Sequence, residues 1–252
     1  MLSFGSTLRG YNVEATDGKI GTAVDFLFDD RTWLVRWLVV DLGDWLPGRK
    51  VLLHPVAIGE TDHGRQTLCV KLTKAQVQAS PEKSAYEPVS AQMERHLYEY
   101  YGWETSSIEN AFGANPISSR FSAPPLFMSS SETASLSEAP HDGDPNLRSV
   151  KAIAGYHIQA SDGAIGQIED LLIDETVWRI RYLVIDTGNW LPGKKVLISP
   201  YAVREISWAD RQIRLDVKCD QVRSSPSWSS LGEIDATYEK DLHDHYDWPG
   251  HT

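Results

Sequence analysis

The chain has 252 residues, of which 41% are hydrophobic and 23% are charged, a composition typical of a globular protein with a buried core. Its formal net charge of -11 argues against nucleic-acid binding, because such proteins need a basic face that displaces counterions from phosphates. Two cysteines, Cys69 and Cys219, are too few for a disulfide framework, and neither lies in a CxxC pair of the kind that binds metal.

The N-terminal stretch "MLSFGSTLRGYNVEA" lacks the charged start and apolar core of a signal peptide. No uninterrupted apolar run reaches the roughly 18 residues that a membrane span needs. We therefore expect a cytoplasmic protein that does not insert into a membrane directly.

The chain contains an internal duplication, which has to be considered before any local structure. Residues 10–58 align with residues 155–203 without a gap, and 25 of these 49 positions are identical. The same offset continues as far as Tyr101 and Trp103, which match Tyr246 and Trp248. The duplication predicts two domains of one fold, at residues 1–103 and 149–252, each folding separately.

The first repeat begins with the pattern of a β-hairpin. Asp-Gly in "ATDGKIG" favours a tight turn between strands, because glycine accepts a positive φ. The stretches "IGTAVDFLFD" and "LVRWLVVD" that follow are rich in β-branched and aromatic residues, which favour strands. With "KVLLHP" and "TLCVKLT", the repeat is predicted to hold about five or six short antiparallel strands in a small closed barrel.

Between two of these strands lies the loop "DLGDWLPGRKVLLHP", and its counterpart is "DTGNWLPGKKVLISP". Pro47-Gly48 and Pro192-Gly193 suit the two central positions of a type II turn, whose second position requires a positive φ. A large Trp-Leu pair beside a turn is unusual because turns normally face water. Two interpretations stay open: the Trp closes the barrel from within, or it is an exposed anchor for a partner.

Each repeat ends in a predicted amphipathic helix, in which apolar residues recur every four positions. We expect this face to pack against the barrel or the neighbouring copy. The residues are Val89, Met93, Leu97 and Tyr101 in the first repeat, and Ile234, Tyr238, Leu242 and Tyr246 in the second.

Residues 104–148, between the repeats, are rich in Ser, Pro, Ala and Gly and show neither helical nor alternating periodicity. Such a segment buries too little apolar area to offset its ordering entropy, so it is predicted to be an irregular linker. It still carries several apolar residues, among them Phe112, Phe121 and Phe127. It is therefore either a mobile tether or a segment that orders against a partner.

The repeated motifs together resemble PRC-barrel domains. The resemblance rests on "DGKIG" and "DGAIG", on "LVRWLVVD" and "RIRYLVID", on the "WLPG" loops, and on "QVQASP" and "QVRSSP". This family takes its name from the photosynthetic reaction-centre H subunit, and a ribosome maturation factor also carries the domain. The resemblance covers both repeats, implies a small β-barrel in each, and supplies no catalytic motif. The predicted fold class is mainly β: two small antiparallel PRC-type barrels, each followed by a C-terminal α-helix.

Two groups of polar residues are candidate sites for metal binding or catalysis. The acidic sets Asp25/Asp29/Asp30 and Asp170/Asp174/Glu175 could bind a cation, but their position before turns favours solvated edges and turn caps. Asp241, His243, His245 and His251 could bind a metal, but the first repeat has Tyr98 and Tyr100 in place of His243 and His245, which favours a solvated helix end. No nucleophile elbow, phosphate-binding loop or zinc-binding helix motif is present. We predict no catalytic residue, no cofactor and no metal.

The sequence favours a non-enzymatic protein-interaction or assembly module. Its reaction-centre resemblance suggests an adaptor at the cytoplasmic face of a membrane complex, held peripherally at the inner membrane by a protein partner such as a subunit of that complex. Homo-oligomerisation stays open. The alternative is a small-ligand binder or enzyme that uses the cleft between the barrels. The candidate partner-binding residues are those of the duplicated loops: Trp45, Leu46, Arg49, Trp190, Leu191 and Lys194.

Overall fold

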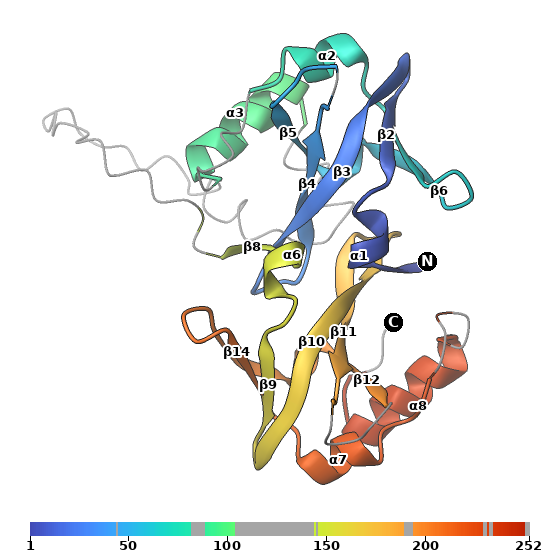
Figure 1. Cartoon of the computed structure of the whole chain (residues 1–252), viewed down its shortest axis with the longest axis vertical. Helices are drawn as coiled ribbons and strands as arrows, with labels where there is room; N and C mark the ends of the chain where they lie inside the picture. Colours follow the sequence, from blue (N-terminus) through green and yellow to red (C-terminus); the bar gives the residue numbers. More distant parts are fainter. Residues whose placement is uncertain are drawn as a thin grey trace, which may run out of the picture. The chain divides into compact units, whose positions relative to one another are not determined.

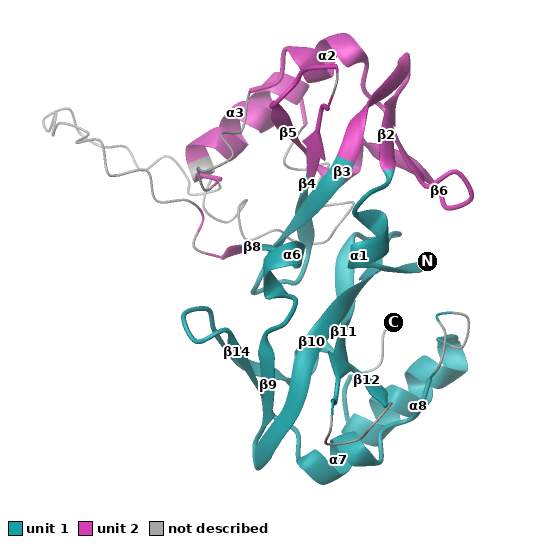
Figure 2. Ribbon diagram, in the orientation of Figure 1, with its two compact units in different colours: residues 1–11, 23–38, 148–252 teal, residues 12–22, 39–147 magenta. Residues whose placement is uncertain are grey.

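The computed structural model describes residues 1–43, 45–81, 89–103, 144, 146–188, 194–228, 231 and 234–249. The chain divides into two compact units (Figure 2). Unit 1 consists of Met1–Tyr11, Ala23–Leu38 and Arg148–Thr252, and unit 2 consists of Asn12–Thr22 and Val39–Leu147. Unit 1 therefore combines the second repeat with two segments of the first.

The sheet of the first repeat has the strand order β5-β4-β3-β2-β7-β6, with β8 paired to β3 (Figure 1). The predicted hairpin is present, because β2 and β3 are antiparallel and the chain reverses between Ala15 and Gly18. The strands are β2 (Asn12–Ala15), β3 (Gly18–Asp29), β4 (Val35–Asp41), β5 (Lys50–Leu53), β6 (Ile58–Asp62), β7 (Thr67–Val70) and β8 (Leu147–Ser149).

The second repeat builds a sheet of the same order, β12-β11-β10-β9-β14-β13, with β1 paired to β10. The predicted mainly β fold, built from two copies of one arrangement, is thus confirmed. Over the described residues, however, each sheet is an open path of strands rather than a closed barrel. The strands are β1 (Leu2–Phe4), β9 (His157–Ala160), β10 (Gly163–Asp174), β11 (Arg179–Asp186), β12 (Lys195–Ile198), β13 (Val203–Ser207) and β14 (Gln212–Leu215).

One strand pair in each sheet departs from the expected antiparallel arrangement. Strand β14 runs parallel to β9, and β7 runs parallel to β2. The cause is the order of connections: β13 and β14 form a hairpin, and the other edge of β14 then pairs with β9, an earlier strand of the same repeat. All other strand pairings with a given register are antiparallel, as predicted.

Both predicted C-terminal helices are present, as α3 (Ala91–Tyr101) and α8 (Ala236–Tyr246). Each is followed by a tyrosine-tryptophan stack: Tyr101 on Trp103 at 4.3 Å between ring centres, and Tyr246 on Trp248 at 4.2 Å. Burial raises the pKa of Tyr101 and of Tyr246 to about 12. In both repeats, the Tyr-x-Trp motif therefore forms a stacked aromatic pair at the C-terminal end of the helix.

Short helices that the sequence analysis did not predict complete the fold. They are α1 (Gly5–Leu8), α2 (Lys74–Gln78), α6 (Val150–Ile153) and α7 (Cys219–Arg223), with the 3-10 turns η1 (Pro55–Ala57) and η2 (Pro200–Ala202). The first backbone N–H groups of α2 and α7 are capped by the hairpin aspartates: Asp17 accepts from Lys74, and Asp162 from Cys219, both at 2.8 Å. This backbone hydrogen bond lowers the pKa of Asp162.

Strand β1 inserts the N-terminus of the first repeat into the sheet of the second, within unit 1. Leu2 pairs with Asp174 and Phe4 with Leu172 on the edge of β10. The following helix α1 contacts both β10 and α6, and its Leu8 is fully buried. The N-terminal residues of the first repeat therefore extend the sheet of the second repeat.

The exchange is reciprocal, because equivalent residues of the two repeats make equivalent contacts inside unit 1. The backbone N–H of Ser6 donates to Asp170 Oδ1 at 3.1 Å, and that of Lys151 donates to Asp25 Oδ1, also at 3.1 Å. Each aspartate thus caps a short helix of the other repeat. The acidic residues Asp25 and Asp170 are therefore helix caps, whereas the sequence favoured solvated edges and turn caps at these positions.

The central turns of the two repeats exchange backbone hydrogen bonds in the same way. Val35 N–H donates to the Trp178 carbonyl at 2.7 Å, and Ile180 N–H donates to the Trp33 carbonyl at 2.8 Å. Both tryptophans have a positive φ, 59° for Trp33 and 48° for Trp178. A non-glycine residue keeps this conformation only where the surrounding structure enforces it. The paired bonds hold both turns in register.

The predicted domain boundaries, at residues 1–103, 104–148 and 149–252, follow the repeats and stay a prediction. Most of the predicted linker lies outside the described residues. In the residues that the structure describes, no helix has the length and hydrophobicity needed to cross a membrane.

Candidate binding pocket

The first duplicated loop has the predicted turn. Gly48 has a φ of +78°, as the second central position of a type II turn requires, and Arg49 N–H donates to the Leu46 carbonyl at 3.1 Å. Trp45 and Leu46 are half-buried, and the Lys74 ammonium lies 5.8 Å from the centre of the Trp45 ring. The counterparts Trp190 and Leu191 lie outside the described residues.

The basic residue after each Pro-Gly turn has a structural task. The Arg49 guanidinium donates to the Ser80 carbonyl. The Lys194 ammonium donates to the carbonyls of Arg223 and Ser225, each at 2.9 Å. In each repeat, the basic residue after the Pro-Gly turn thus binds the backbone next to the "SP" motif. This contact accounts for the presence of both motifs in both repeats. A partner-binding role for the loop residues stays a proposal.

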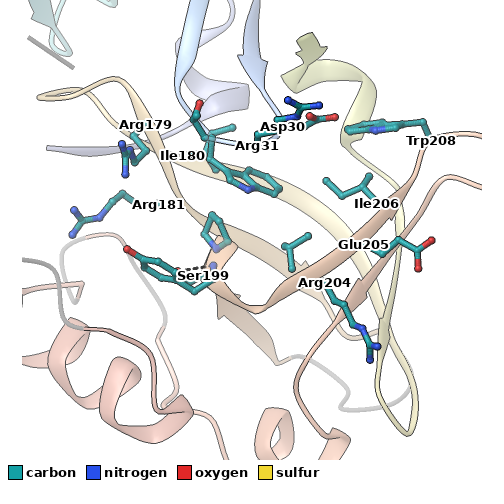
Figure 3. Close-up of a pocket in the computed structure, with 15 residues that line it drawn as sticks. Asp30, Arg31, Arg179, Ile180, Arg181, Ser199, Arg204, Glu205, Ile206 and Trp208 are labelled. Atoms are coloured by element: carbon teal, nitrogen blue, oxygen red, sulfur yellow. Dashed lines mark hydrogen bonds between the residues drawn. The ribbon is translucent and has the colours of Figure 1, made fainter. Parts of the chain in front are cut away.

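Unit 1 contains a pocket of about 590 Å³ (Figure 3). It lies where the turn at residues 30–33, from the first repeat, meets β11, η2 and β13 of the second. Its volume is in the range of small-ligand and peptide-anchor sites, roughly 300–1,000 Å³. Its position thus depends on the reciprocal contacts of the central turns.

Two buried apolar residues of the pocket lining, Trp33 and Ile180, form its floor. Trp33 is buried, stacks on Phe28 at 5.4 Å between ring centres, and is held by the bond from Ile180. Asp29 holds the turn that precedes Trp33, because its carboxylate accepts hydrogen bonds from the backbone N–H groups of Arg31 and Thr32 at 3.0 and 2.9 Å. The floor is therefore preformed.

One aromatic residue of the pocket faces solvent. Tyr201, in η2, is 55% exposed and is one of the few exposed large hydrophobic residues that the structure shows. Tyrosine combines a large apolar ring with a hydroxyl group and is frequent in protein interfaces. The rim of the pocket thus offers an apolar surface beside the buried floor.

Four arginines line the pocket, and they differ in how their charge is balanced. Arg181 is half-buried and pairs with Glu239 at 3.0 Å and with Asp174 at 3.6 Å. Arg31, Arg179 and Arg204 are exposed, and none of them forms an ion pair with any residue that the structure describes. Three positive charges are therefore available to a ligand.

The two acidic residues of the pocket are already neutralised from outside it. Asp30 accepts a hydrogen bond from Arg148 at 3.1 Å, and the Arg148 guanidinium lies 4.3 Å from the centre of the Trp208 ring. Desolvation raises the pKa of Asp30, although Arg148 opposes this change. Glu205 pairs with Arg214 at 3.2 Å. The lining arginines keep their excess positive charge.

The unpaired arginines are absent from the equivalent positions of the other repeat. Arg31 corresponds to Thr176, Arg179 to Leu34, and Arg204 to Gly59. Arg181, by contrast, corresponds to Arg36, which pairs with Asp29 at 3.6 Å just as Arg181 pairs with Asp174. The shared arginine belongs to the framework, whereas the three unshared ones give this pocket its own charge.

The other polar groups weighed from the sequence have structural partners. Asp29 is buried rather than a solvated edge, because it caps the turn at Arg31 and pairs with Arg36. The expectation of a solvated helix end is wrong for His243, which is 3% exposed. Its Nδ1 lies 2.8 Å from the Pro249 carbonyl and its Nε2 lies 3.2 Å from the Tyr182 hydroxyl. The packing of α8 on β11 buries it.

Both histidines of this helix lie within hydrogen-bond distance of a backbone carbonyl oxygen. His245 Nε2 lies 2.8 Å from the Gln221 carbonyl. Among the described residues, no group of three or more His, Cys, Asp and Glu side chains is arranged to hold a metal ion. His251 lies outside the described part of the chain.

Sequence reasoning missed the pocket for an identifiable reason. It looked for features that both repeats share, whereas the unpaired arginines are features in which the repeats differ. The pocket also joins residues about 150 positions apart, which no local pattern connects. A comparison of charge at aligned positions would have found Arg179 opposite Leu34 and Arg204 opposite Gly59.

Comparison with known proteins identifies the fold family. The model of the PRC-barrel domain matches residues 2–77 and 150–221, which together make up more than half of the chain. A comparison with curated proteins gave no match. The two matched segments correspond to the two repeats, and each includes the hairpin, the central strands and the "WLPG" loop. The chain therefore belongs to the PRC-barrel domain family and carries two copies of the domain.

Proposed function

We propose that this protein is a non-enzymatic interaction module that binds a partner protein at the pocket of unit 1. PRC-barrel domains are generally protein-interaction modules and are generally non-catalytic. The observation that carries the proposal is the set of unpaired arginines, Arg31, Arg179 and Arg204, around a preformed aromatic floor. Arginine and aromatic residues dominate the binding energy of many protein interfaces.

We also propose a more specific role, that of an adaptor at the cytoplasmic face of a membrane complex. In this role the partner protein is a subunit of that complex. The proposed location rests on the resemblance to the reaction-centre H subunit. The duplicated loops with Trp45 and Arg49 are a second proposed contact surface. In the first loop, the half-buried Trp45-Leu46 pair and the exposed Pro47-Gly48 turn support such a role.

Replacement of two pocket arginines is expected to abolish partner capture. In Arg179→Leu/Arg204→Gly, both residues are exchanged for those of the first repeat, so each new side chain already occurs at the aligned position of the same fold. The tagged chain would be used to capture proteins from cytosol and from solubilised membranes of the native cells, with quantification by mass spectrometry.

We expect a partner that the wild-type chain enriches to fall about tenfold or more with the double variant, since hydrogen bonds to charged groups contribute about 1.5–3 kcal/mol each. The matched control is Arg65→Leu, which removes an exposed arginine outside the pocket. Capture of the same proteins in the same amounts by all three chains would reject the pocket as the binding surface.

A second candidate function is the binding of a small anionic ligand in the same pocket. Its volume of about 590 Å³ and its uncompensated charge favour this alternative. Native mass spectrometry of the purified chain distinguishes the two functions. A bound small molecule that disappears in Arg179→Leu/Arg204→Gly would support the ligand-binding alternative, and an unliganded chain would leave the interaction module as the better account.

A further inference from the structure

The charge around the pocket of unit 1 indicates the chemistry of its ligand. The chain as a whole has a net charge of -11, so a site with excess positive charge stands out against its own protein. Arg181 forms ion pairs with Glu239 and Asp174. Asp30 and Glu205 form ion pairs with Arg148 and Arg214, neither of which lines the pocket. The remaining charge comes from Arg31, Arg179 and Arg204.

The arginines surround the pocket instead of converging on one point. Figure 3 shows Arg179 and Arg181 along one side and Arg204 along the opposite side. They come from three separate segments, namely the turn after β3, the start of β11, and β13. A single phosphate or carboxylate group contacts only one such position, whereas an extended chain with several negative groups reaches more than one.

The floor between the charges is apolar and aromatic. Trp33 and Tyr201 both line the pocket, and their exposed fractions are 7% and 55%. A ligand that satisfies both features has anionic groups on either side of an apolar or aromatic group. Planar guanidinium groups suit carboxylates, which they bind through paired hydrogen bonds.

We propose that the pocket of unit 1 binds an acidic linear segment of a protein partner, with Asp or Glu side chains flanking an aromatic or aliphatic residue. This inference rests on the proposed function and specifies its partner. Arg179 and Arg204 bind carboxylates on opposite sides of the pocket, and the central apolar residue of the segment packs on Trp33 and Tyr201. The first repeat lacks this charge, since Leu34 and Gly59 stand at the aligned positions.

The test measures binding of a defined peptide to the full chain by fluorescence anisotropy. The probe is a fluorescein-labelled peptide with two glutamates on each side of a phenylalanine. The matched probes replace the glutamates by glutamines or the phenylalanine by alanine. We expect the first peptide to bind more tightly than either matched probe, and its affinity to fall as salt is added, because exposed charges are screened.

Arginine variants assign the binding to the pocket. We expect Arg179→Leu and Arg204→Gly each to weaken binding about five- to tenfold, and the double variant to weaken it further, while Arg65→Leu leaves binding within about twofold. Melting temperatures of all variants are measured in parallel. A loss of affinity without a lower melting temperature supports the proposal.

Several results would overturn it. Equal affinity for the glutamate and glutamine peptides, or unchanged affinity in the double variant, would show that the arginines do not recognise an acidic segment. Tight binding of pyrophosphate that the glutamate peptide fails to displace would assign the pocket to small anions instead. If partner capture still depends on Arg179 and Arg204 while the peptide does not bind, the interaction module stands and the acidic segment is rejected.

Discussion

Deletion of residues 1–8 is expected to destabilise unit 1 by about 3–5 kcal/mol. The deletion removes β1 from the edge of β10 and leaves Asp170 without the Ser6 N–H that it caps. It also removes Leu8, which is fully buried, and burial of such a side chain contributes about 1.5–3 kcal/mol. Unfolding by urea, compared between the full chain and a chain that begins at Arg9, measures the effect.

The single variant Leu8→Ala is the matched control for this deletion. It should account for about 2–3 kcal/mol and leave β1 in place, so the deletion should exceed it. An unchanged urea midpoint after deletion of residues 1–8 would contradict the exchange between repeats. It would also favour the original expectation that residues 149–252 fold separately.

Gly166→Ala is expected to destabilise the chain by about 3 kcal/mol, at the upper end of the usual cost of overpacking. A Cβ atom at Gly166 would lie 2.0 Å from the Asp186 carbonyl oxygen and 2.9 Å from the Thr187 Cα. Both contacts are with backbone, so β10 and β11 would have to separate. The equivalent Gly21 is in the same position, with 2.1 Å to the Asp41 oxygen. This close approach explains the duplicated "IG" motif.

Gly163→Ala is the control for this prediction, because a Cβ there would meet only the end of a side chain, Cys219 Sγ at 3.2 Å. The two variants lie on the same strand and add the same methyl group. Urea midpoints and hydrogen exchange of β10 and β11 compare them. Equal stability of the two alanine variants would show that the backbones do not approach as closely as the structure indicates.

Features that depend on local sequence were predictable. The duplication set the number of copies, the Asp-Gly pairs marked the hairpins, and Pro47-Gly48 marked a turn that Gly48 adopts with a positive φ. The four-residue spacing marked α3 and α8, although Val89 and Ile234 lie just before the helices. Each of these signals spans only a few residues, and the structure has the predicted element at each of them.

Features that depend on distant partners were not predictable. Segments as short as β1 and α1 have no periodicity to detect, and their stability comes from β10, about 170 residues away. Helix α2 does carry a signal in the sequence, since Thr73 and Gln76 form a capping box, but the sequence analysis did not predict a helix there. The parallel pairing of β14 with β9 likewise follows from topology rather than composition.

The candidate site shows the same division. The loop residues Trp45 and Arg49 were prominent because both repeats have a tryptophan and a basic residue at these positions, and Arg49 serves the fold through its bond to Ser80. The arginines of the pocket were not prominent because they occur once. In this duplicated chain, shared residues belong to the common framework, whereas the unshared arginines, which come from both copies, give the pocket its charge.

The central claim is that a partner protein contacts the pocket of unit 1, and photo-crosslinking from the exposed Tyr201 position tests it most directly. A benzophenone side chain placed there would be compared with the same group at Tyr100, another exposed tyrosine, which lies on α3 in unit 2. We predict that one partner crosslinks at position 201 and not at position 100, and that its yield falls about tenfold in Arg179→Leu/Arg204→Gly. Crosslinking only at position 100, or an unchanged yield at position 201 in the double variant, would contradict the account.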